Sequence, residues 1–199
     1  MNVQQRSFVM ATDLAGYVKV YDGIVSPEKC QEIIDLYEVN KDLHNRIDNE
    51  GRPNFTQLNI TTHAEKDETF VGIQQELVTY FNQSLREYGR DAPVTDFQFP
   101  PRYAYEHLRI KKYRNDDEDC FDLHTDVGDH ASARRFLAFF LYLNDVEIGG
   151  ETVFPDIDVR VAPKAGSVLV FPPMWMWRHE GRKPVSGPKY IVGSYLHYL

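Results

Sequence analysis

Apolar residues in the first half of the chain recur at helical spacing. Ser26 and Pro27 are typical of a helix start, as the capping residue and the first helical residue. The apolar positions that follow lie three and four residues apart and share one face: Cys30, Ile33, Ile34 and Tyr37. A second helix is predicted over residues 67–88, where the apolar stripe consists of Phe70, Ile73, Leu77, Tyr80, Phe81 and Leu85.

The stretch between these two helices, residues 40–62, is polar and is interrupted by Gly51 and Pro53. This pattern predicts a long loop. Loops of this length in compact domains are often functional, so residues 40–62 are a candidate lid over a binding site.

From about residue 106 the period changes from helical to strand-like. Residues 106–113 alternate, with Leu108 and Ile110 on one face and polar residues on the other. Residues 136–143 are apolar throughout, which predicts a strand covered on both faces. Shorter strands are expected at residues 18–21, 152–154, 159–161, 167–171 and 190–196. Helices followed by a series of short strands predict an α+β fold with a β-sandwich or barrel.

Composition narrows the class of protein only modestly. The 199 residues fit a single domain spanning 1–199, and the net charge of −8 argues against nucleic acid or an anionic membrane as partner. Cys30 and Cys120 form no C-x-x-C pair and are interpreted as separate reduced thiols. Because no signal peptide or membrane-spanning pattern is evident, the cytoplasm is the expected location.

The pattern His124-x-Asp126 is the strongest candidate for chemistry. Side chains at positions i and i+2 of a strand point to the same face, so both residues could reach one metal ion. His179 lies far downstream, and its strand would have to lie opposite in a closed sheet. Two histidines and one carboxylate hold Fe(II) on one face and leave positions open for O2. The alternative is a chance triplet, with a core histidine and a turn aspartate.

Lys189 begins a strand-like segment whose alternate positions are Lys189, Ile191 and Gly193. A lysine that faces the interior of a barrel is costly unless it has a partner. A cosubstrate that carries a carboxylate would supply this partner. The alternative is a solvent-facing lysine at the start of a strand.

Several fragments, in their order and spacing, resemble the Fe(II)/2-oxoglutarate-dependent dioxygenases, and within them the prolyl 4-hydroxylase-like branch. The resemblance runs from about Tyr105 to the C-terminus, and 21–22 with 26–30 resemble the family's entry helix. Its fragments are Tyr113, FDLHTD at 121–126, FLYLND at 140–145, GGETVFP at 149–155, PKAGSVLVF at 163–171, His179, Pro184-Val185, Gly187 and Lys189-Tyr190.

This resemblance implies a fold and a cofactor set. The implied fold is a double-stranded β-helix (jelly-roll or cupin-like) core over 101–199, with helices and a loop from 1–100 packed on one sheet. The implied iron ligands are His124, Asp126 and His179, and the implied cosubstrates are 2-oxoglutarate and O2, with ascorbate as a further candidate.

The resemblance also implies the residues that bind the cosubstrate. Lys189 would pair with the far carboxylate of 2-oxoglutarate, where many relatives carry Arg and the collagen-type prolyl 4-hydroxylases carry Lys. Tyr113 would donate a hydrogen bond to the same carboxylate, and Thr152 is a lesser candidate for this pocket. Arg182, which also follows His179, is a rival to Lys189.

The implied reaction is hydroxylation of an aliphatic C–H bond, with release of succinate and CO2. A peptidyl proline is the leading substrate, as in the prolyl 4-hydroxylases. A free amino acid or small metabolite is the alternative substrate. A non-catalytic jelly-roll binding module and a zinc hydrolase are the alternatives from other classes.

Residues near the predicted site supply candidate contacts for a substrate. Trp175 and Trp177 precede His179 and either pack at the barrel rim or form a substrate platform. Tyr103 and Tyr105 are further aromatic candidates, and Arg134 and Arg135 precede a buried strand and are candidates to face the substrate. The acidic run 115–119 is either a solvated loop or a surface that attracts a basic peptide.

Overall fold

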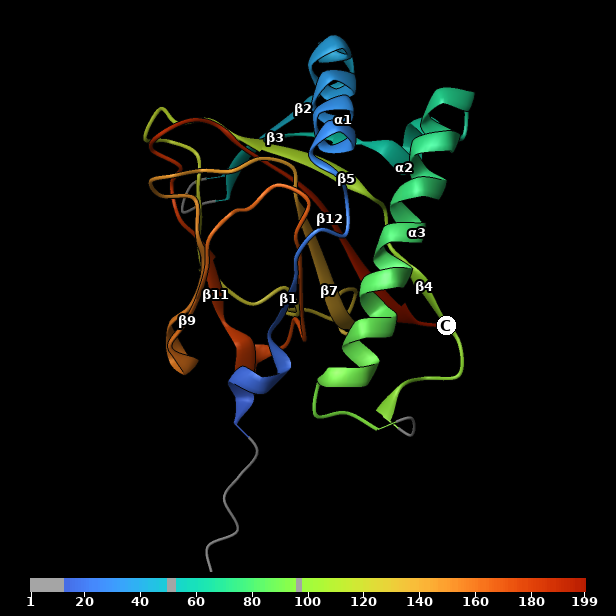
Figure 1. The fold of residues 1–199 in the computed structure, drawn as a ribbon, viewed down its shortest axis with the longest axis vertical. Helices are drawn as coiled ribbons and strands as arrows, with labels where there is room; N and C mark the ends of the chain where they lie inside the picture. The colour runs from blue at the N-terminus through green and yellow to red at the C-terminus, as the bar shows by residue number, and fades with distance from the viewer. Residues whose placement is uncertain (1–12, 50–52, 96–97) are drawn as a thin grey trace, which may run out of the picture.

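Two antiparallel sheets and two long helices form the core of the protein (Figure 1). The computed structural model describes residues 13–49, 53–95 and 98–199. In this described part, the larger sheet has the strand order β1-β10-β7-β12-β5-β3-β2, and β4 pairs with β12. Its strands are β1 (Lys19–Tyr21), β2 (Asn45–Asp48), β3 (Asn54–Asn59), β4 (Tyr103–Tyr105), β5 (Arg109–Tyr113), β7 (Arg135–Tyr142), β10 (Val168–Phe171) and β12 (Lys189–Tyr198).

The smaller sheet has the order β6-β11-β8-β9. Its strands are β6 (Phe121–His124), β8 (Thr152–Phe154), β9 (Val159–Val161) and β11 (His179–Gly181). Figure 1 shows β9 and β11 on the side of the larger sheet away from the helices. The predicted α+β arrangement, with N-terminal helices packed on one sheet, is confirmed.

The alternation of side chains along the central strands divides the core into two layers. In β7, Leu137, Phe139 and Leu141 pack with helix residues, whereas Ala138, Phe140 and Tyr142 pack between the sheets. All six side chains are at most 7% exposed. The uninterrupted apolar run therefore is a strand covered on both faces, as the sequence predicts.

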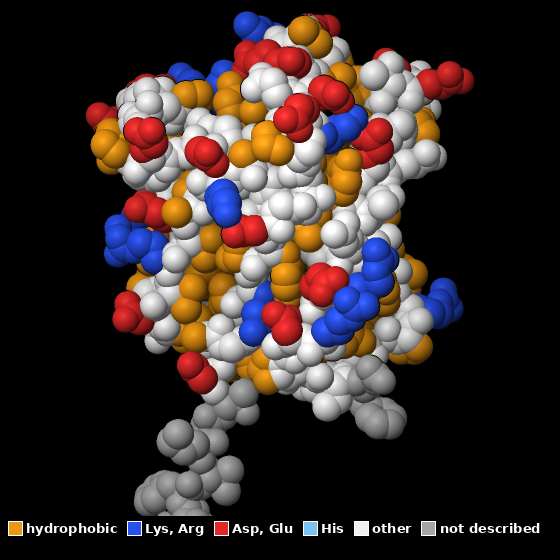
Figure 2. Space-filling model, in the orientation of Figure 1, with side chains coloured by type: hydrophobic (Ala, Val, Ile, Leu, Met, Phe, Trp, Pro, Cys, Tyr) orange, Lys and Arg blue, Asp and Glu red, His pale blue; other side chains and the backbone are white. Residues whose placement is uncertain are grey.

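The helices cover the outer face of the larger sheet. Helix α1 (Pro27–Val39) begins after Ser26, whose side chain accepts a hydrogen bond from the Lys29 amide, and α3 (Glu68–Asp91) begins after Asp67. The short helix α2 (Ile60–Ala64) precedes α3. Figure 2 shows acidic side chains gathered at the upper end of this face, where α1 lies.

The prediction of a long loop over residues 40–62 is wrong. In the described part of this stretch, β2 and β3 form a hairpin that extends the larger sheet, and β3 pairs with β5. Phe55 and Leu58 of β3 are buried at the two faces of the sheet. Polar residues in these two strands at the edge of the sheet, of which β2 is the outermost, mask the strand period, so polarity alone indicates a loop.

No helix among the described residues is long and apolar enough to cross a membrane.

Candidate metal centre

Pairing between β6 and β11 brings the two histidines together. His124 is the last residue of β6, and His179, the first residue of β11, lies directly opposite it in the ladder. The strand of His179 is therefore next to β6 in the same sheet and is hydrogen-bonded to it. The expectation that this strand lies on the opposite side of a closed sheet is wrong. Asp126 follows β6 by two residues, and one ligand atom from each of the three residues lies within 4.8 Å of the others.

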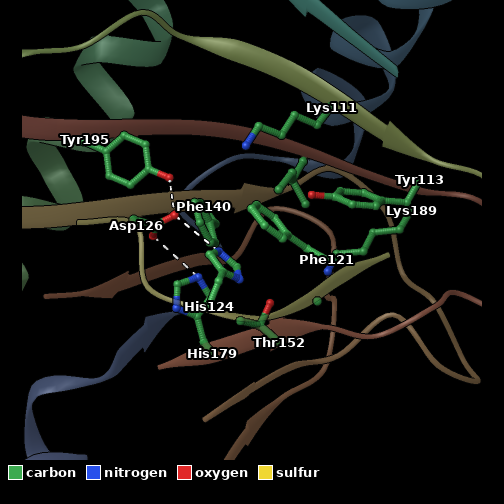
Figure 3. Close-up of a pocket in the computed structure, with 12 residues that line it drawn as sticks. Lys111, Tyr113, Phe121, His124, Asp126, Phe140, Thr152, His179, Lys189 and Tyr195 are labelled. Atoms are coloured by element: carbon green, nitrogen blue, oxygen red, sulfur yellow. Dashed lines mark hydrogen bonds and ion pairs between the residues drawn. The ribbon is translucent and has the colours of Figure 1, made fainter. Parts of the chain in front are cut away.

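The hydrogen bonds of the histidine rings leave their Nε2 atoms directed at this cluster. His124 Nδ1 lies 2.7 Å from the Asp122 carbonyl, and His179 Nδ1 lies 3.2 Å from the Trp177 carbonyl. Because a carbonyl can only accept, each Nδ1 carries the proton and each Nε2 presents a lone pair. Figure 3 shows both rings directed at Asp126.

Two buried polar atoms of the cluster lack a hydrogen-bond partner among the described residues, namely His124 Nε2 and Asp126 Oδ2. The third candidate ligand, His179 Nε2, lies 3.5 Å from Asp126 Oδ2. Unsatisfied buried polar atoms cost about 1–3 kcal/mol each, so they are retained where a ligand satisfies them. Nitrogen and oxygen donors of this number and type fit Fe(II).

Charge in the cluster favours metal binding. Burial raises the pKa of Asp126, but the nearby His179 and His124 and the hydrogen bond from Tyr195 outweigh it, so the pKa lies below its usual range. Burial lowers the pKa of His179 to about 4. At neutral pH Asp126 is therefore a carboxylate and His179 is a neutral imidazole, which are the forms that bind a metal.

Lys189 occupies the other end of the same cavity. It is the first residue of β12, opposite Tyr113 of β5, and is only 3% exposed, so the alternative of a solvent-facing lysine is wrong. Its Nζ donates a hydrogen bond to the Gly150 carbonyl over 2.6 Å. Burial lowers the pKa of Lys189 to about 7.

Tyr113 and Thr152 also line this cavity, as the sequence predicts. The Tyr113 ring lies 5.6 Å from Lys189 Nζ. Thr152 Oγ1 and Tyr142 Oη lie 2.8 Å apart, and either can be the donor. The structure thus gathers Lys189, Tyr113 and Thr152 at one end of the cavity, as a carboxylate site requires.

Two residues that the sequence analysis did not single out also line the cavity, Tyr195 and Lys111. Tyr195 donates a hydrogen bond from its phenol to Asp126 Oδ1 over 2.8 Å. Lys111 belongs to β5, two residues before Tyr113. The strand period could have identified both residues. Tyr195 lies six residues after Lys189 on β12, and Lys111 lies two residues before Tyr113 on β5, so each shares the inward face of a predicted site residue.

The other candidate residues from the sequence, among them Tyr103, Tyr105 and Arg134, do not line the cavity. Trp177 is 4% exposed and donates from its indole to the Leu14 carbonyl, which supports rim packing. Trp175 is 73% exposed, and Arg182 pairs with Glu180 on the surface. Arg135 lies nearer the site: it donates to the Asp126 carbonyl and binds Glu106 through two nitrogens.

The acidic run at 115–119 is mostly paired within the protein. Asp119 is fully buried, accepts hydrogen bonds from Arg114 and forms an ion pair with Arg46. Asp116 and Glu118 also pair with Arg114. These ion pairs support a structural role for the run.

Comparison with protein families gives a match for residues 108–197 to the family described as the 2OG-Fe(II) oxygenase superfamily. Among curated proteins, the chain is 32% identical over 100 residues to a probable prolyl 4-hydroxylase 11 of Arabidopsis thaliana, covering 47% of this chain and 33% of the relative. It is 26% identical over 171 residues to a probable prolyl 4-hydroxylase 9 of the same plant, covering 76% of this chain and 56% of the relative. The matches thus span between a third and somewhat over half of these relatives.

Solved structures show the same fold. A viral collagen prolyl hydroxylase from Paramecium bursaria Chlorella virus-1, in its 2OG complex, superposes with a TM-score of 0.62 at 19% identity, covering 92% of this chain and 96% of that one. A prolyl hydroxylase from Trichoplax adhaerens, in complex with a hypoxia inducible factor oxygen degradation domain peptide fragment, superposes with a TM-score of 0.69 at 14% identity. The match covers 92% of this chain and 84% of that one. The predicted double-stranded β-helix fold is confirmed.

Proposed function

The chain belongs to the 2OG-Fe(II) oxygenase superfamily, in its prolyl 4-hydroxylase-like branch, and from this premise we propose that it hydroxylates an aliphatic C–H bond. The proposed reaction converts 2-oxoglutarate, O2 and R–H into succinate, CO2 and R–OH. One oxygen atom enters succinate and the other enters the product. Peptidyl proline is the proposed substrate, supported by the names of the relatives and by the peptide bound to the Trichoplax neighbour.

The observation that carries this proposal is the set of unsatisfied ligand atoms in a cavity that also contains a buried lysine. His124, Asp126 and His179 would hold Fe(II), which when bound supplies the redox chemistry for oxidising both 2-oxoglutarate and the substrate. A non-catalytic module has no need of buried atoms without partners, because they destabilise the fold.

The protein residues have separate tasks in this reaction. Lys189 would bind the far carboxylate of 2-oxoglutarate as a charge-assisted pair, with Tyr113 and Thr152 beside it. Tyr195 holds Asp126 through Oδ1, so that Oδ2 stays directed at the metal position. Phe140 and Ile191 also line the cavity with apolar side chains, which would exclude water from the reaction.

Spectroscopy tests the proposed metal and cosubstrate binding. Anaerobic addition of Fe(II) and 2-oxoglutarate should give a weak visible charge-transfer band, and His124→Ala should abolish it. The exposed His130 provides a matched control, and His130→Ala should leave the band unchanged. An unchanged spectrum in the wild-type protein with full metal loading would remove the dioxygenase proposal.

Succinate release tests the substrate. Release above the substrate-free background should appear with proline-containing peptides if the substrate is peptidyl proline. Turnover of free amino acids alone would favour the alternative of a small-molecule hydroxylase. Mass spectrometry of the product should show a gain of one oxygen atom in either case.

A further inference from the structure

Two lysines enter the cavity, and only one of them has a hydrogen-bond partner. Lys189 Nζ donates to the Gly150 carbonyl. Lys111 Nζ lies 4.9 Å from the centre of the Phe55 ring, and within the described residues it forms neither a hydrogen bond nor an ion pair. Burial lowers the pKa of Lys111 to about 8. An ammonium so placed is costly unless an anion joins it.

The Lys111 side chain lies toward the metal end of the cavity. The end of the Lys111 side chain lies over Gly193 of β12, since a Cβ atom at Gly193 would be 3.9 Å from Lys111 Cε. Gly193 is two residues from Tyr195 on this strand, so the two positions share a face. The carboxylate that attracts Lys111 electrostatically is Asp126. In Figure 3 the Lys111 ammonium lies on the side of Asp126 and Tyr195, whereas that of Lys189 lies on the side of Thr152.

The side chains around Lys111 at this end carry an excess of positive charge. Arg109 precedes Lys111 by two residues on the same face of β5, and its hydrogen bond goes to the His107 carbonyl, with no ion pair in the described chain. Arg135 is paired with Glu106. Because Asp126 is committed to the metal, Lys111 and Arg109 are left without a carboxylate in a protein whose net charge is −8.

We propose that Lys111, supported by Arg109, binds a carboxylate on the substrate, next to the C–H bond that is hydroxylated. This inference rests on the proposed function and makes its substrate class anionic. Two sources share this chemistry: the carboxylate of a free amino acid, and an Asp or Glu side chain beside the target proline of a peptide. An unpaired ammonium in a cavity of low polarity gives strong preference for such a group over its neutral amide.

Binding of matched probes tests this inference without turnover. The protein is loaded anaerobically with Fe(II) and 2-oxoglutarate, and calorimetry compares N-acetyl-L-proline with N-acetyl-L-prolinamide. A second pair of proline peptides differs only in Asp or Asn before the proline. The acidic member of at least one pair should bind about 10-fold or more tightly than the neutral one. The pair that shows this preference identifies the source.

Substitution of Lys111 connects the preference to this residue. Lys111→Met should remove the preference for the acid and leave the Michaelis constant for 2-oxoglutarate within about twofold, whereas Lys189→Met should raise that constant strongly. Lys111→Gln provides a second variant if Lys111→Met folds poorly, and the wild-type comparison of acid with amide needs no variant.

Two results would overturn the assignment: equal binding of acid and amide in the wild-type protein, or a Lys111→Met variant that loses 2-oxoglutarate affinity as Lys189→Met does. The second result would assign Lys111 to the cosubstrate. Failure of the proposed function is a separate observation, because it would appear as a loss of the charge-transfer band and of succinate release in the wild-type protein.

Discussion

The two ends of the cavity differ in how completely the protein satisfies its own polar groups. At the far end, Lys189 is bonded to Gly150, and Thr152 is bonded to Tyr142. At the metal end, His124 Nε2 and Asp126 Oδ2 have no partner among the described residues. The far end therefore is formed before any ligand arrives, whereas the metal end is completed by its ion.

This difference has a physical origin in the strands that carry Lys189 and the two histidines. At the far end, Lys189 begins β12, which pairs over most of its length with β5 and β7, and Thr152 of β8 comes from the smaller sheet. The metal end depends on short strands of the smaller sheet, where the ladder between β6 and β11 shifts register after His179. A carboxylate pocket requires fixed donors, whereas a metal site requires lone pairs that the protein leaves open.

Removal of a metal ligand should give the largest effect. Asp126→Asn keeps the size of the side chain but removes the charge, so the affinity for Fe(II) should fall by more than about 100-fold. Titration of Fe(II) under anaerobic conditions measures this loss. His130→Ala, at an exposed position, should change the affinity by less than about twofold. Equal affinities in Asp126→Asn and the wild-type protein would show that the ion binds elsewhere.

Titration of Lys189 should give the next largest effect. With its pKa lowered to about 7 by burial, Lys189 is increasingly neutral in the empty site above pH 7. A bound carboxylate favours the ammonium, so binding of 2-oxoglutarate must take up a proton there, and its affinity should fall about tenfold per pH unit above pH 7. Dissociation constants measured from pH 6.5 to 9 would show this slope.

Controls separate Lys189 from its charged neighbours. Glu151 raises the pKa of Lys189 and Lys111 lowers it, and the rings of Tyr113 and Tyr142 lie within 5.6 Å and 5.4 Å of Nζ. Lys189→Arg should flatten the pH dependence, because a guanidinium stays charged. Lys111→Met should retain most of it. A flat profile in the wild-type protein would show that the pKa of Lys189 is not lowered in the empty site.

Loss of the Tyr195 hydroxyl should give a smaller effect confined to the metal end. Tyr195→Phe removes the donor to Asp126 Oδ1 but keeps the ring, which packs against the Arg135 guanidinium at 4.2 Å. The affinity for Fe(II) should fall by about tenfold while 2-oxoglutarate affinity holds. Tyr198→Phe, at a half-exposed position of the same strand, is the matched control. Equal Fe(II) affinity in both variants would show that Tyr195 does not position Asp126.

Much of this architecture follows from local pattern. The helix that starts at Ser26 and the apolar run of β7 carry periodicities that tertiary contacts reinforce. The sequence alone indicates His124 and Asp126 as neighbours at a strand end and His179 and Lys189 as candidates farther along the chain, and the resemblance to a known family implies the role of each. The family model and the relatives confirm that resemblance.

Other features depend on contacts between distant residues and leave no local signal. The sequence predicts a loop in place of the hairpin of β2 and β3, because these strands have many polar positions and form only through the pairing of β3 with β5. Tyr195 and Lys111 were missed because a tyrosine or lysine in a strand gains its role only from the cavity it faces. Trp177 was a candidate substrate contact, but its indole is bonded to the Leu14 carbonyl.

Substitution of Arg182 should have the smallest effect on 2-oxoglutarate affinity. This prediction decides whether Lys189 or Arg182 binds the far carboxylate of 2-oxoglutarate. Its side chain is 43% exposed and its Nε bonds to Glu180 Oε1 over 3.0 Å, a surface pair of little energetic value. Arg182→Met should therefore change the 2-oxoglutarate dissociation constant by less than about twofold, against about 100-fold for Lys189→Met, which removes a buried cation. Both constants come from the same anaerobic absorbance titration. A loss in Arg182→Met as large as that in Lys189→Met would mean that the far carboxylate extends past Lys189 toward the surface, and the far end would then not be preformed.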